Sequence, residues 1–137
     1  MRMTAWHLVA LVATILVAGL AGCGPSGPTP PPAGAAGVVI TAVAAPTCPV
    51  EQIPPDPACA PRPVPGAEIR ISTPDGQEVA TVRLDGTGRA TIALAPGQYV
   101  VTGLPVAGLL GTPAPIPVTV DAAGFAAVDL VYDTGIR

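Results

Sequence analysis

Three cysteines carry the covalent chemistry open to this chain of 137 residues. Cys23 follows Leu20-Ala21-Gly22 at the end of an apolar run, whereas Cys48 and Cys59 lie in a proline-rich segment. A cysteine thiol can be acylated, oxidised to a disulfide or used as a metal ligand. The single histidine, His7, precedes all three cysteines. Two thiols without an imidazole leave a metal site incomplete, so we predict no metal site and no cofactor.

The residues before Cys23 have the order of a bacterial export signal, with Arg2 as the positive charge and residues 8–19 as the apolar run. The tetrapeptide 20–23 resembles the lipobox of bacterial lipoproteins, in which the cysteine receives a diacylglyceryl group and becomes the first residue after cleavage. The resemblance implies a signal peptide over residues 1–22, lipids such as palmitate on Cys23, and attachment to the extracytoplasmic face of the cell membrane. Two alternatives stay open. One is an uncleaved anchor, although the run is shorter than the roughly 20 residues that span a bilayer; the other is ordinary cleavage to a soluble product.

Residues 23–36 follow as a segment of prolines, glycines and alanines without hydrophobic periodicity. Such a composition favours extended, unpacked chain. We therefore expect a disordered linker that holds a domain away from the membrane. A proline-rich ligand for a recognition domain is the alternative.

The thiols of Cys48 and Cys59 remain once the first cysteine is acylated, and in an exported protein they should form a disulfide. They lie within residues 46–65, which contain eight prolines. Because a crosslinked, proline-rich loop has few conformations to lose, Val50 and Ile53 are candidate contacts with a protein partner. The alternative is a loop that only covers an edge of the fold.

The remainder of the chain must position this loop, and it alternates between short β-prone runs and turn sequences. Apolar and polar residues alternate at period two in residues 67–72, 78–84 and 89–95, which predicts half-buried strands. Turn sequences such as Asp85-Gly86-Thr87-Gly88 separate them. No window has apolar residues at helical spacing, so the fold class is all-β. The remaining four of seven predicted strands are residues 38–43, 98–104, 116–120 and 125–132.

Three segments carry a family resemblance: Val64-Pro65-Gly66-Ala67 before a strand, the 85–88 turn, and Pro96-Gly97-Gln98-Tyr99. They resemble the carboxypeptidase regulatory-like and Cna protein B-type domains. The resemblance implies a transthyretin-like (prealbumin-like), seven-stranded Greek-key β-sandwich over residues 37–137, with Tyr99 in its core. Some Cna-type domains form a Lys–Asn isopeptide bond. This chain contains neither residue type, so that bond is impossible here.

Composition narrows the function. The chain has six arginines, which are scattered along the sequence, and nine acidic residues. It therefore offers no basic patch that could bind nucleic acid. Aromatic residues make up only 3% of the chain, and the mature part has no histidine, so we predict no enzyme. Asp133-Thr134-Gly135 matches the aspartic-protease triplet, but those enzymes need two such aspartates, each supported by the chain that follows it. Only two residues follow here.

These observations together predict a membrane-anchored extracytoplasmic lipoprotein. Its β-sandwich would serve as a structural or protein-interaction module for an unknown protein of the cell envelope. The alternative is a small-ligand or carbohydrate-binding module of the envelope.

Overall fold

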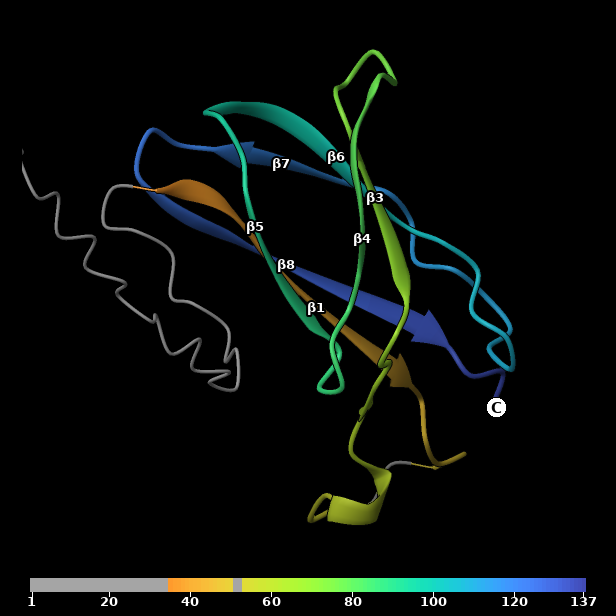
Figure 1. The fold of residues 1–137 in the computed structure, drawn as a ribbon. Helices are drawn as coiled ribbons and strands as arrows, with labels where there is room; N and C mark the ends of the chain where they lie inside the picture. The colour runs from red at the N-terminus through yellow and green to blue at the C-terminus, as the bar shows by residue number, and fades with distance from the viewer. Residues whose placement is uncertain (1–34, 51–52) are drawn as a thin grey trace, which may run out of the picture.

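The computed structural model describes residues 35–50 and 53–137, which form two β-sheets packed face to face (Figure 1). The predicted signal peptide, the lipidation site Cys23 and all but the last two residues of the predicted linker lie outside the described residues. The elements in chain order are β1 (Ala36–Ala45), the 3₁₀ turn η1 (Pro57–Cys59), β2 (Arg62–Pro63), β3 (Glu68–Ser72), β4 (Glu78–Arg83), β5 (Arg89–Ala93), β6 (Gly97–Gly103), β7 (Ile116–Val120) and β8 (Gly124–Asp133).

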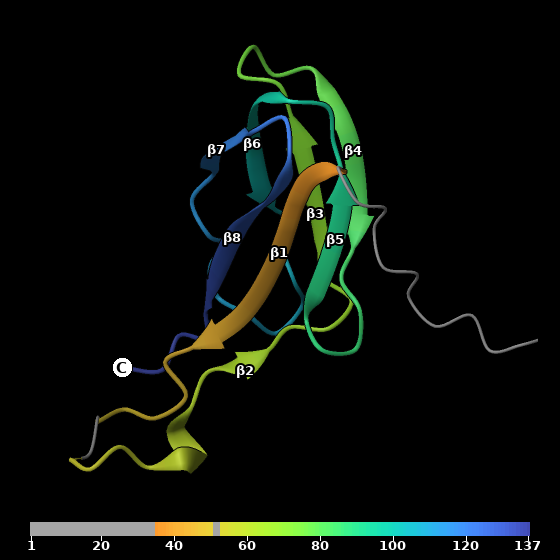
Figure 2. The same cartoon turned by 90° about the vertical axis from the view of Figure 1, so that its left-hand side faces the viewer.

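One sheet, called here the front sheet, is built around β1. Strand β8 runs parallel to β1 over the full length of both strands. The other edge of β1 is shared by β5, which pairs with its first half, and β2, which pairs with Val43 and Ala44. The second or back sheet has the order β4-β3-β6-β7 with all neighbours antiparallel. Figure 2 shows β8, β1 and β5 side by side in front of the back sheet.

The core lies between the sheets. It consists of the inward-pointing side chains of the strands, along which inward and outward residues alternate. Tyr132 is fully buried, and its hydroxyl donates a hydrogen bond of 3.1 Å to the Leu104 carbonyl. Tyr99 is 9% exposed and donates to the Ala95 carbonyl at 2.9 Å, which places it in the core as the family resemblance implied. The other fully buried side chains of large volume are Val38, Ile40, Ile69, Ile71, Val101, Val120 and Leu130.

The predicted β-sandwich is confirmed, and each of the seven predicted strands is present within two residues of its expected bounds. The structure adds β2, which has only two residues and therefore no alternation to detect. Its Pro63 also lacks the N–H that a strand position normally supplies. Within residues 35–50 and 53–137, no helix has the length and apolar character needed to cross a bilayer.

Candidate functional site

Residues 46–65, called here the stapled loop, connect β1 to β3 and project from one end of the sandwich (Figures 1 and 2). A disulfide joins Cys48 to Cys59, whose Cα atoms are 5.3 Å apart, so the predicted crosslink is present. The bond closes a ring within the loop. The ring fixes the path of the chain at a point where neither sheet supports it.

Hydrogen bonds hold the second half of the stapled loop next to the disulfide. Asp56 caps η1, because its carboxylate accepts a hydrogen bond of 2.9 Å from the Ala58 N–H. Across the disulfide, the Thr47 hydroxyl donates to the carbonyls of Cys59 and Ala60. The two halves of the loop are therefore connected by side-chain hydrogen bonds as well as by the covalent bond.

The far end of the stapled loop is attached to the sandwich by β2. Arg62 and Pro63 pair with Ala44 and Val43 of β1. The next residue, Val64, is buried and donates its N–H to the Ala42 carbonyl at 3.0 Å. Strand β2 occupies the edge of β1 beside the loop, so a partner cannot pair with the β1 backbone there. A partner at this end would therefore contact the stapled loop itself.

The two candidate contact residues are both exposed to solvent, Val50 by 70% and Ile53 by 98%. Ile53 borders a hollow of about 490 Å³ whose other walls come from the second half of the loop. Val50 is not part of that hollow. The hollow is lined by Ile53, Pro55, Asp56, Pro57, Cys59, Ala60 and Pro61.

A second hollow, of about 420 Å³, lies at the base of the stapled loop and is called here the basal groove. Its apolar walls come from four segments that are distant in sequence: Ala44, Val64, Val106 with Leu109, and Ile136. Arg62, Thr47 and Thr134 add polar groups. Sequence reasoning missed this groove, because only the fold brings its segments together. The available signal was weak: Val106, Leu109 and Ile136 are apolar residues outside the alternating strands.

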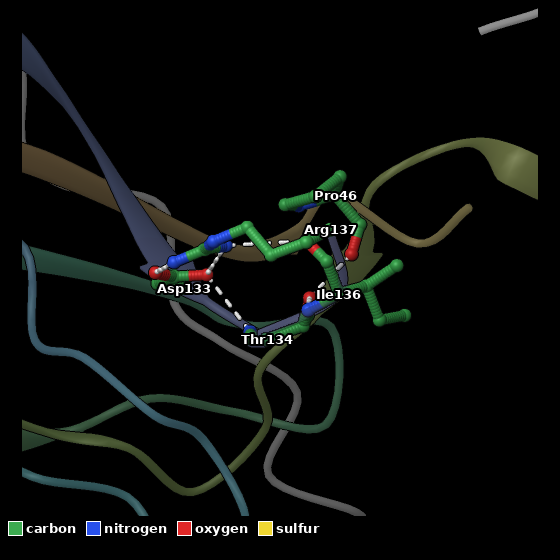
Figure 3. Close-up of polar contacts among 6 residues, drawn as sticks. Pro46, Asp133, Thr134, Ile136 and Arg137 are labelled. Carbon is green, nitrogen blue, oxygen red and sulfur yellow. Dashed lines mark hydrogen bonds and ion pairs between the residues drawn. The ribbon is translucent and has the colours of Figure 1, made fainter. Parts of the chain in front are cut away.

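The Asp133-Thr134-Gly135 triplet forms a turn that ties the chain end to the start of the stapled loop (Figure 3). The Asp133 carboxylate accepts hydrogen bonds from the Arg137 guanidinium at 2.8 and 3.1 Å and from the Gly135 N–H at 2.8 Å. The guanidinium, and then the Gly135 N–H, lower the pKa of Asp133 to about 2. The Thr134 hydroxyl donates to the Pro46 carbonyl. The triplet therefore has a structural role here, with its carboxylate bound in an ion pair.

The part of the chain that the structure describes contains no set of side chains suited to binding a metal ion. There, no group of three or more histidine, cysteine, aspartate or glutamate side chains gathers in a way that could hold a metal ion.

Comparison with known proteins identifies a similar fold and no family. No protein family model matches this chain. No curated protein matches it significantly. Among solved structures, the chain is similar to the crystal structure of GBS52, the minor pilin of the Gram-positive pathogen Streptococcus agalactiae, with 15% sequence identity and a TM-score of 0.56. The match covers 74% of this chain but only 45% of the pilin. At this identity the likeness concerns the fold alone, and it agrees with the two-sheet β-sandwich described above.

Proposed function

We propose that this chain is a lipoprotein that displays its β-sandwich outside the cytoplasmic membrane as a structural or protein-interaction module. The observation that carries the proposal is the exposure of Val50 and Ile53 on a loop held by a disulfide. A loop fixed before binding loses little conformational entropy when a partner covers it. The aliphatic side chains supply the apolar area, and the contact needs no catalytic group. The pilin-like fold is in keeping with such a role.

The direction of β1 supports the same proposal. The chain enters the sandwich at Ala36 and leaves β1 at Ala45, where the stapled loop begins. Ten strand residues span roughly 33 Å. An anchor on Cys23 would attach to the entry end of β1. The stapled loop would then lie at the end of the domain farthest from the membrane, where an envelope partner can reach it.

The alternative, a small-ligand or carbohydrate module, has the basal groove as its natural site. Ligand pockets are commonly lined by aromatic as well as aliphatic side chains. The walls of the basal groove, all within the described residues, contain no aromatic ring. A protein contact on the stapled loop is therefore the function that the geometry supports best.

Anchoring is tested by changing Cys23→Ser in the full chain and growing the cells with a radioactive or clickable fatty acid. We expect the label to disappear and the precursor to keep its leader. A Ser variant that is processed and stays on the membrane as before would contradict the anchor.

The contact surface is tested in intact cells with a photoreactive amino acid at position 53. Irradiation should give one discrete crosslinked product, and adding Val50→Ser should reduce its yield several-fold. The matched control places the photoreactive residue at Asp75, an exposed position on the turn between β3 and β4. A product formed from position 75 but not from position 53 would move the contact surface away from the stapled loop.

A further inference from the structure

The outer faces of the two sheets differ in character. The back sheet presents polar side chains to solvent, and its charges are paired across strands: Arg83 with Glu68, and Arg70 with Glu78. This is the usual pattern of a sheet with one solvated face. The back sheet therefore needs no further cover.

The outer face of the front sheet is mostly apolar. Strand β1 directs Val39, Thr41 and Val43 outward, and all three are only half-buried. In Figure 2 no described segment crosses this face. We call it the front face; its other outward residues are Pro63, Thr91, Ala93, Phe125, Ala127 and Val131, together with the charged Arg89 and Asp129.

The two charges of the front face lie in one row. Thr41 pairs with Arg89 of β5 on one side and with Asp129 of β8 on the other. The two charged residues are thus two strand spacings apart, roughly 10 Å between backbones. Both are exposed, and among the described residues neither forms a salt bridge. The row therefore has a positive end, a neutral centre and a negative end.

We propose that the front face binds a second copy of this chain through a two-fold axis that runs parallel to β1. Rotation about this axis exchanges the two flanks of β1, so Arg89 of each copy faces Asp129 of the other. Val39 and Val43 then lie against the same residues of the second copy. A two-fold axis across the strands would instead bring Arg89 against Arg89, which is repulsive. The charge row thus selects both the partner and its orientation.

The size of the face sets the strength of this association. The 27 residues of β1, β8, β5 and β2, each occupying about 4.8 Å by 3.3 Å, give a face of roughly 430 Å² per copy. Two such faces together cover roughly 860 Å², which is less than a stable interface buries and lies in the range of weak, transient contacts. We therefore expect a weak dimer whose affinity falls as salt screens the two ion pairs.

The experiment detects the dimer in intact cells. Two copies of the full chain with different C-terminal tags are co-expressed with Thr41→Cys, and a mild oxidant is added outside the cells. Because β1 faces β1 in the dimer, we expect a disulfide-linked band of twice the mass that carries both tags. The control is Thr81→Cys, an exposed outward residue of the back sheet, which should give no such band.

Charge reversal tests the orientation. Arg89→Glu alone and Asp129→Arg alone should each reduce the two-tag band at least tenfold, because each places like charges opposite one another. Co-expression of the Arg89→Glu copy with the Asp129→Arg copy should restore it, since both contacts become attractive again. The reversal Asp75→Arg, on the turn between β3 and β4 of the back sheet, should have no effect.

Three outcomes overturn the proposal. They are absence of the two-tag band, a crosslink from the Thr41→Cys variant to a different protein, and a two-tag band whose intensity changes with neither charge reversal. A folding defect is detected separately by limited proteolysis, because a folded β-sandwich stays protected from the protease and an unfolded chain does not. If a reversal variant loses that protection, the neutral change Arg89→Gln replaces it. That variant must still lower the band, or the proposal fails. The proposal does not depend on the function assigned to the stapled loop.

Discussion

Removing the disulfide of the stapled loop tests how much this crosslink contributes to the free energy of unfolding. The double change Cys48→Ser and Cys59→Ser removes a ring of 12 residues, counted from 48 to 59 inclusive. The loop-closure entropy of such a ring is worth about 3 kcal/mol. Four prolines inside the ring already restrict the unfolded chain, which lowers that gain. We expect the free energy of unfolding to fall by about 1 to 3 kcal/mol.

The sandwich itself should remain folded in this variant. Both cysteines are only half-buried and neither belongs to the core. The loop also keeps the Asp56 cap and its pairing through β2. Loss of the crosslink therefore loosens the loop without removing any contact between the sheets.

Urea unfolding, followed by the fluorescence of Tyr99 and Tyr132, measures the effect. In a thermal scan, a loss of 1 kcal/mol in the free energy of unfolding corresponds to a decrease in Tm of roughly 4 to 8 °C for a domain of this size. Wild-type protein under reducing conditions should match the double variant, and Val50→Ser with Ile53→Ser should unfold like the wild type. Equal stability of oxidised wild type and double variant would refute the loop-closure reasoning. Complete unfolding of the variant would show that the loop is part of the core.

Three further predictions concern the sandwich and its closing turn. Gly103→Ala should destabilise the fold by roughly 1 to 3 kcal/mol in urea unfolding, because the new methyl group would lie 2.6 Å from the Tyr132 hydroxyl. Tyr132→Phe should cost about 0.5 to 1.5 kcal/mol in the same assay, since the carbonyl of the half-buried Leu104 loses its donor. The lowered pKa of Asp133 means that its ion pair with Arg137 stabilises the fold above about pH 4 and is lost as pH falls through about 2. In acid unfolding, Asp133→Asn should therefore have a flatter stability profile than the wild type between pH 4 and 2; an identical slope would contradict the assignment.

Local sequence patterns were sufficient to predict most of the strand positions. Features that depend on pairing between distant segments could not be predicted from the sequence. Period-two alternation located β3, β4 and β5, and the turns at Gly76 and Gly88 adopt the positive φ angles that their turn sequences demand. Nothing local distinguishes β8 as the parallel neighbour of β1. The charge row of Arg89, Thr41 and Asp129 depends on that pairing and could not be predicted. The basal groove was hidden for the same reason, because its walls meet only after the sheets have packed.

The proposed anchor and the proposed dimer favour the same geometry. A two-fold axis parallel to β1 leaves the strand direction unchanged, so both copies enter at one end of the dimer and both stapled loops project from the other. Two anchors on Cys23 could then sit in the same membrane. A two-fold axis across the strands would place the entry ends at opposite ends of the dimer, so one linker would have to run back along the roughly 33 Å of the domain to reach the same membrane. The charge row, which selects the first axis, thus agrees with the proposed anchor, and the resulting dimer would present two loops side by side to a multivalent partner.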